Sequence, residues 1–259
     1  MSPEIKVIKI GGNVIDDPVA LKSFVKDFAA LPGMKVLVHG GGKEATRLSA
    51  KLGIETQMIN GRRVTDRATL DVVTMVYAGL INKRIVAMLQ AEGCDAIGLS
   101  GADGNVIKAK RRPVAPVDYG YVGDIAADSV NDSFISMLLD NGLTPVFCAI
   151  NHDASGELLN CNADSVASAV AVACSRIGQT SLTFCFEKAG VLADVNDESS
   201  VIRSISSANY EILKADGTIS GGMLPKVDNA FKAISEGVSS VTIKSSAALI
   251  DDAGTTITK

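Results

Sequence analysis

IKVIKIGG, residues 5–12, sets the architecture of this chain: an apolar run ends in two glycines. A short apolar run of this kind predicts a buried β-strand, and the glycines predict an immediate turn. HGGG, residues 39–42, repeats the arrangement after the apolar run 36–38 and leads into a helical pattern that stops near Gly53. Strands that alternate with helices in this way favour an α/β fold, with a mostly parallel sheet covered by helices on both faces.

The alternation continues to the end of the chain. Asp17-Pro18 is an N-cap and first-turn signal for one helix, and Thr65-Asp66 begins a long helix that reaches about Glu92. Residues 104–125 carry the turn signals of a hairpin. The remaining predicted elements are strands at 96–99, 145–150, 181–186 and 238–243, and helices at 134–139, 163–175, 210–214 and 223–234.

Bulk composition excludes several classes of protein. The 259 residues suffice for one large α/β domain or two lobes, and the net charge of −4 argues against a nucleic-acid surface. The wholly apolar runs are far shorter than the roughly 18–20 residues of a membrane span, and the N-terminus lacks a signal-peptide layout. Five cysteines without a CxxC pair, with two histidines, favour reduced thiols in a cytoplasmic protein over disulfides or zinc.

Two lysines beside paired glycines point to phosphoryl transfer. Lys9 precedes Gly11-Gly12, and Lys226 follows Gly221-Gly222. The two lysines are about 217 residues apart. Such chemistry needs charge neutralisation and positioning more than a covalent protein nucleophile. HGGG before a helix offers unobstructed N–H groups to an anion. It is not a P-loop, because Lys43 is followed by an acidic residue.

Other polar residues have a functional and a structural interpretation. Arg62 and Arg63, just before a capped helix, fit a carboxylate or a solvated loop equally well. Asn160, Asn162 and Asp164 alternate and could face one cleft, although Asp164 also suits an ordinary first helical turn. His39 could serve as a base, but a packed histidine is the favoured interpretation.

Seven segments, in order along the whole chain, resemble the amino-acid kinase family. They are KIGG (9–12), HGGG (39–42), NGRRVT (60–65), GLSGADG (98–104), YVG (121–123), NCNAD (160–164) and GGMLPK (221–226). The resemblance implies a three-layer α/β/α sandwich with a mostly parallel central sheet. Residues 1–178 would form an N-terminal lobe for acyl-amino-acid binding and dimerisation, and residues 179–259 a C-terminal lobe for ATP, within one continuous domain.

The resemblance also implies an activity and a set of roles. The activity is ATP-dependent phosphorylation of the γ-carboxylate of an N-acyl-L-glutamate to an acyl phosphate in arginine biosynthesis. Lys9 and Lys226 would neutralise the phosphoryl group in flight, and Asp164 would hold both ammonium groups. The substrate-binding residues would be Gly41, Gly42, Arg63, Asn160 and Asn162. The nucleotide-binding residues would be Gly11, Gly12, Glu187, Gly190, Gly221, Gly222 and Met223.

The same resemblance assigns no metal ligands to the protein. Mg²⁺ would be carried on the ATP phosphates, and the partners would be small molecules, with no nucleic acid and no membrane. The γ-carboxylate is ionised at neutral pH, so no general base is required and His39 is not needed for one. The resemblance implies that arginine-inhibited relatives carry an extra N-terminal helix that links dimers into a hexamer. The first predicted strand here begins about four residues from Met1, so we expect a homodimer without arginine feedback.

The chain departs from the family pattern in four places. Arg62 replaces a usual leucine, Met58 and Ile59 stand near a usual lysine, Glu187 replaces a usual aspartate, and YGYVG (119–123) replaces an LGHVG-like segment. Three of these changes fall in or near the acyl-amino-acid pocket. Arg62 could pair with a second carboxylate, as on N-succinylglutamate, or it could point to solvent.

Two other functions stay open from the sequence alone. A sibling kinase for a carrier-linked aminoadipate would need a basic patch, and Lys108, Lys110 and Arg111-Arg112 are a candidate, although a solvated hairpin is the favoured interpretation. A catalytically silent amino-acid sensor would have lost Lys9, Asp164 or Lys226, and all three are present.

Overall fold

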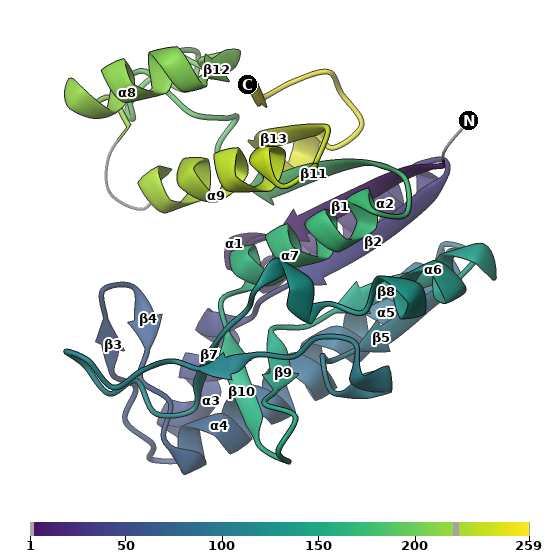
Figure 1. Cartoon of the computed structure of the whole chain (residues 1–259), viewed down its shortest axis with the longest axis vertical. Helices are drawn as coiled ribbons and strands as arrows, with labels where there is room; N and C mark the ends of the chain where they lie inside the picture. The colour runs from purple at the N-terminus through teal and green to yellow at the C-terminus, as the bar shows by residue number, and fades with distance from the viewer. Residues whose placement is uncertain (1–2, 220–222, 259) are drawn as a thin grey trace.

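An eight-stranded sheet runs through the centre of the computed structural model, which describes residues 3–219 and 223–258 (Figure 1). Its order is β12-β14-β13-β11-β1-β2-β8-β5, and every neighbouring pair is parallel except β13 and β14. The strands are β1 (Glu4–Ile10), β2 (Met34–His39), β5 (Ala96–Leu99), β8 (Thr144–Phe147), β11 (Gln179–Phe186), β12 (Ser204–Ser206), β13 (Ser240–Ser245) and β14 (Thr255–Thr258).

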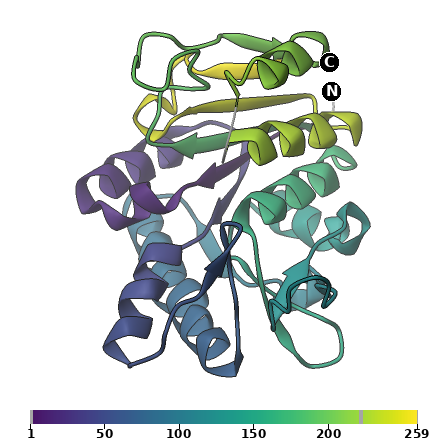
Figure 2. The same ribbon diagram turned by 90° about the vertical axis from the view of Figure 1, so that its left-hand side faces the viewer.

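Helices cover both faces of this sheet and complete the predicted α/β/α sandwich (Figure 2). On one face lie α1 (Gly12–Asp16), α2 (Pro18–Ala30), α3 (Gly42–Lys51), α4 (Arg67–Thr74) and α5 (Asn82–Ala91). On the other lie α6 (Asp132–Asp140), α7 (Ala163–Ser175), α8 (Ser207–Ala215) and α9 (Leu224–Ser235). The sequence-based prediction of the fold class is therefore confirmed.

The two faces have separate hydrophobic cores, because successive side chains of a strand point to opposite sides. On β1, Ile5 and Val7 belong to the core beneath α7 and α9, whereas Ile8 and Ile10 belong to the core beneath α2 and α5. This alternation places Lys9 on the α7 and α9 face.

The predicted long helix begins at its cap but is not uniform. Asp66 accepts a hydrogen bond from the backbone N of Thr69 at 2.8 Å and starts α4. A π-helical segment, η1 (Met75–Ile81), then separates α4 from α5. By length and composition, the continuous helix 67–91 could cross a membrane. Its Leu70, Val73, Val76 and Ile81 side chains are buried in the core, which identifies it as a core helix.

A smaller four-stranded sheet, in the order β6-β7-β10-β9, lies beside the carboxyl ends of the central strands. Its strands are β6 (Lys110–Arg111), β7 (Val122–Asp124), β9 (Ile150–His152) and β10 (Leu158–Cys161). The predicted hairpin corresponds to the antiparallel pair β6 and β7. The prediction of a single strand over 145–150 was wrong, because the chain leaves the central sheet after Phe147 and resumes in the small sheet as β9.

Candidate active site

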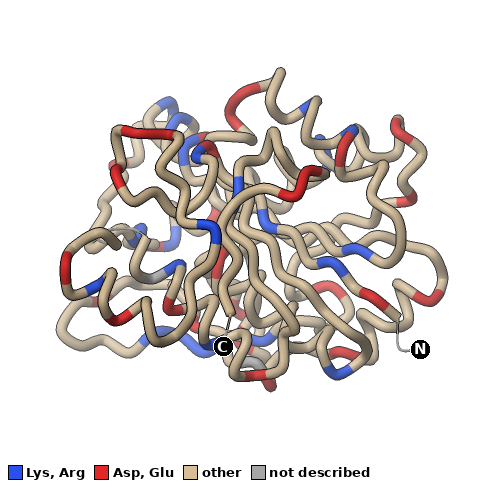
Figure 3. Tube along the Cα trace, turned by 90° about the horizontal axis from the view of Figure 1, so that it is seen from above, with Lys and Arg blue, Asp and Glu red and all other residues tan. Residues whose placement is uncertain are grey.

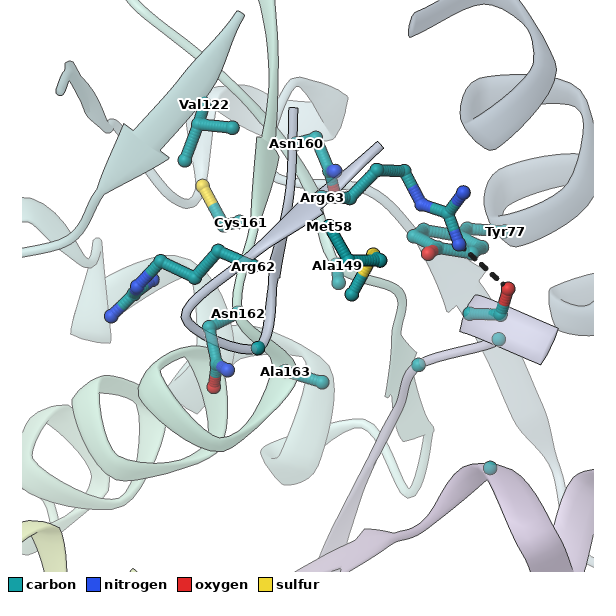
Figure 4. Close-up of a pocket in the computed structure, with 15 residues that line it drawn as sticks. Met58, Arg62, Arg63, Tyr77, Val122, Ala149, Asn160, Cys161, Asn162 and Ala163 are labelled. Carbon is teal, nitrogen blue, oxygen red and sulfur yellow. Dashed lines mark hydrogen bonds between the residues drawn. The ribbon is translucent and has the colours of Figure 1, made fainter. Parts of the chain in front are cut away.

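A cavity of about 240 Å³ opens where the glycine turns after β1 and β2 meet the small sheet (Figure 4). A two-stranded hairpin, β3 (Met58–Ile59) and β4 (Arg62–Arg63), forms another wall. The lining residues are Gly12, Gly40, Gly41, Gly42, Met58, Gly61, Arg62, Arg63, Tyr77, Val122, Ala149, Asn160, Cys161, Asn162 and Ala163.

Lys9 and Lys226 flank the carboxylate of Asp164. Lys9 Nζ lies 2.6 Å from Asp164 Oδ1, and Lys226 Nζ lies 2.7 Å from Asp164 Oδ2. The three side chains come from β1, α9 and the first turn of α7. The carboxylate therefore holds two ammonium groups in fixed positions, although the three residues are distant from one another in the sequence.

Asp164 stays ionised in this setting. Burial by itself would raise the pKa of the carboxyl group, but the charges of Lys9 and Lys226 and their hydrogen bonds outweigh that effect and bring the pKa from 3.8 to about 2. The Asp164 side chain is 15% exposed, so solvent screens this attraction only weakly. Two positive charges against one negative charge leave this group of three residues with a net positive charge at neutral pH.

Arg63 is fixed by the first turn of α3. Its Nη2 donates to the carbonyl oxygen of Gly42 and to Thr46 Oγ1, both at 2.8 Å, and its Nη1 donates to Thr56 Oγ1 at 3.1 Å. The residue is 8% exposed and lines the cavity. A guanidinium held in this way presents a defined, preorganised charge to an anionic ligand.

Arg62 lies on the same hairpin but extends in a different direction from Arg63 (Figure 4). Neighbouring residues of a strand point to opposite sides, which explains the divergence. Arg62 lines the cavity, and its side chain forms no hydrogen bond or salt bridge with the residues that the structure describes. Within that part of the chain, the cavity therefore holds one arginine with protein partners and one without.

Asn160 and Asn162 both line the cavity, but each side chain also has a structural partner. Asn160 Nδ2 donates to Thr65 Oγ1 at 3.0 Å. Asn162 Oδ1 caps α7 by accepting from the backbone N of Asp164 at 2.8 Å and of Ser165 at 3.1 Å. The cap fixes the first turn of α7, and with it the position of the Asp164 carboxylate.

The glycines of the two turns differ in what surrounds them. A Cβ on Gly41 would lie 2.3 Å from Ile81 Cδ1 and 2.9 Å from Tyr77 Cδ1, so a side chain there would collide with η1. A Cβ on Gly12 would meet nothing within 4 Å. Gly11 donates its backbone N–H to the carbonyl oxygen of Cys185 at 2.9 Å, which ties the first turn to β11.

Tyr77 is a cavity residue that the sequence analysis missed. It lies in the π-helical segment η1, is 5% exposed and lines the cavity beside Arg63. Burial raises the pKa of its hydroxyl, and the Arg63 charge opposes that effect. Short π-helical segments often occur at functional sites, but no local pattern of residues signals this one.

Of the expected nucleotide residues, Gly12 lines this cavity, whereas Glu187, Gly190 and Met223 are not among its lining residues. Glu187 follows β11 directly, and Met223 precedes α9. Gly190 is buried, and a Cβ there would lie 2.8 Å from Thr255 Oγ1, so its lack of a side chain has a packing reason. Gly221 and Gly222 lie outside the described residues.

His39 lies on the opposite face of the sheet from Lys9. It is fully buried, its Nδ1 lies 2.8 Å from the carbonyl oxygen of Gly40, and Asn82 Nδ2 lies 3.1 Å from its Nε2. Burial lowers the pKa of His39 to about 4, so the ring is neutral at pH 7. These contacts support the interpretation of His39 as a packed histidine.

Comparisons with known proteins agree with this geometry. Residues 4–245 match the sequence profile of the amino acid kinase family. The chain is 50% identical to an acetylglutamate kinase of Bacteroides thetaiotaomicron over 259 residues, covering 100% of both chains. It is 52% identical to an acetylglutamate kinase of Cytophaga hutchinsonii, covering 96% of this chain and 94% of the relative. The solved structure of smu.665 from Streptococcus mutans UA159 superposes with a TM-score of 0.81 at 30% identity, covering 98% of both chains.

Replacing Asp164 with asparagine should remove a pH-dependent part of the stability. The folded pKa of about 2 lies below the unfolded value of 3.8, so the contribution is present above pH 3.8 and is lost as the pH falls toward 2. The free energy of unfolding of the wild type should exceed that of Asp164→Asn by an amount that shrinks by about 2 kcal/mol between pH 5 and pH 2.

Urea denaturation at several pH values measures this difference. Asp71→Asn is a matched control, because Asp71 is an exposed carboxylate on α4. Its difference from the wild type should stay nearly constant over the same range. If the difference in the free energy of unfolding also stays constant for Asp164→Asn, the lowered pKa of Asp164 is contradicted.

Proposed function

Because the chain belongs to the amino acid kinase family, we propose that it transfers the γ-phosphoryl group of ATP to the γ-carboxylate of N-acetyl-L-glutamate. The product is an acyl phosphate, and the reaction belongs to arginine biosynthesis. The observation that carries the proposal is the Lys9–Asp164–Lys226 group, in which Lys9 precedes the first glycine turn and Asp164 follows the cavity residue Ala163.

The substrate supplies its own nucleophile. The γ-carboxylate is ionised at pH 7, so the protein does not need to remove a proton. Arg63 binds the α-carboxylate through its fixed guanidinium, and Asn160 and Asn162 complete that wall of the cavity. The enzyme then contributes alignment and electrostatic stabilisation.

The two lysines stabilise the charge that shifts during transfer. Lys9 and Lys226 approach the phosphoryl group from β1 and α9, and Asp164 keeps their ammonium groups apart and oriented. Gly11 and Gly12 face the donor phosphates, and Gly41 and Gly42 face the transferred group. Mg²⁺, carried on the ATP phosphates, would neutralise further negative charge.

The remaining expectations complete the proposal. Residues 1–178 bind the acyl amino acid, and residues 179–259 bind ATP, with Glu187, Gly190 and Met223 among the nucleotide residues.

The five cysteines are free and buried, which supports a cytoplasmic location. Basic and acidic residues are interspersed along the trace, which supports small-molecule partners rather than a nucleic acid (Figure 3).

The alternative function, phosphorylation of a carrier-linked aminoadipate, is less well supported. Arg112 pairs with Asp124, and Arg111 Nε donates to the carbonyl oxygen of Gly120 at 2.9 Å. Both arginines are therefore engaged in and around the β6 and β7 hairpin. The two relatives compared above, which match nearly the whole of this chain, are named acetylglutamate kinases.

Lys9→Met and Lys226→Met should each lower kcat about 10²–10³-fold, with a much smaller effect on KM, because both contacts strengthen in the transition state. Hydroxylamine trapping of the acyl phosphate formed from ATP and N-acetylglutamate measures the rate. Lys232→Met, an exposed lysine on the same helix as Lys226, is the control. Near-wild-type kcat in either active-site variant would refute the central assignment.

Arg62 bears on which acyl group the substrate carries. It lines the cavity without a protein hydrogen bond or salt bridge among the described residues, and it could pair with the second carboxylate of N-succinylglutamate. A charge-assisted contact of this kind contributes about 1.5–3 kcal/mol.

Arg62→Leu should therefore reduce kcat/KM for N-succinylglutamate about 10-fold or more and leave that for N-acetylglutamate nearly unchanged. The two substrates are compared in the wild type and the variant. An acetyl preference in the wild type that the substitution does not alter would show that Arg62 does not contact the acyl group.

We further propose a homodimer. Met75 and Leu80 are 54% and 42% exposed on the apolar helix 67–91, and a second copy of the chain would cover them. Leu80→Lys should shift the protein toward the monomer in light scattering coupled to size exclusion. Val19→Lys, at an exposed position on α2, is the control. A monomeric wild type would contradict the proposal.

A further inference from the structure

Two helices begin at the two glycine turns that border the cavity. α1 starts at Gly12 and α3 starts at Gly42, and both glycines line the cavity. The glycines have no side chains with which to fix their own positions. The turns follow strands β1 and β2, which pair up to Ile10 and His39, and contacts between the helices that follow add a further constraint on the separation of the turns.

Two polar contacts join these helices. Lys43 Nζ donates to Asn13 Oδ1, and Arg47 Nη2 donates to Asp16 Oδ1 at 2.8 Å. Lys43 and Arg47 are four residues apart on α3, and Asn13 and Asp16 are three apart on α1. Residues at these spacings share one face of a helix, so the contacts form one row along the two helices.

We propose that Lys43 and Arg47 are positioning residues that set the separation of the two glycine turns. The inference rests on the proposed function, in which one turn faces the donor phosphates and the other faces the transferred group. Reacting groups must be held close to their productive geometry, and a misplacement of about 1 Å can cost on the order of 10²-fold in rate.

Lys43→Met and Asn13→Ala should each lower kcat about tenfold while both KM values stay within about twofold. The double variant should be no slower than either single variant, because both substitutions remove the same contact. Lys43→Arg should retain most of the activity. Lys51→Met, at the exposed end of α3, is the matched control.

Hydrogen exchange gives a readout that does not depend on activity. Amides of residues 11–16 and 40–46 should exchange faster in Lys43→Met than in Lys51→Met. Unchanged kcat and unchanged hydrogen exchange in Lys43→Met would overturn the inference. A rise confined to the KM for ATP would overturn it too, because it would show that Lys43 binds the phosphates of ATP. A wild type that forms no acyl phosphate would instead refute the proposed function, and the exchange comparison would still test the contact.

Discussion

The placement of Asp164 between Lys9 and Lys226 is the interaction on which the rest of the site depends. Two ammonium groups repel one another, and a partly buried carboxylate without cations would be protonated more readily. Together the three charges offset each other's burial, as the Asp164 pKa of about 2 indicates. Because the residues come from β1, α7 and α9, the same contact joins the central strand to two helices.

The cavity lined by the glycine turns contains one arginine that is held by protein partners and another that is available to a ligand. Arg63 has three hydrogen-bond partners in the protein, whereas Arg62 has no hydrogen bond or salt bridge to the described part of the chain. In the proposed function, Arg63 binds the α-carboxylate, and Arg62, which lacks a partner in the described part of the chain, contacts the acyl group. Gly41, which lacks a side chain, lets η1 pack closely against its turn and brings Tyr77 to the cavity.

Much of the fold was predictable, because its signals are local. The apolar run before Gly11 and the caps at Asp17 and Asp66 correspond to observed elements. Asn60-Gly61, with φ of 49° and 73°, is a signal for the β3 and β4 hairpin that the sequence analysis did not use. The division of 145–150 between two sheets was missed, because an apolar run does not reveal where a chain changes sheets.

Local patterns in the amino-acid sequence were enough to establish the α/β alternation, the glycine turns and the residue types suited to phosphoryl transfer. Which of these residues meet was settled only when distant elements packed together. Strand alternation placed Lys9 on the α7 and α9 face and His39 on the other, and folding brought Lys226 to Asp164. Folding also placed Tyr77 in the cavity. The physical reason is that periodicity fixes a residue's side of an element, whereas packing of distant elements fixes its neighbours.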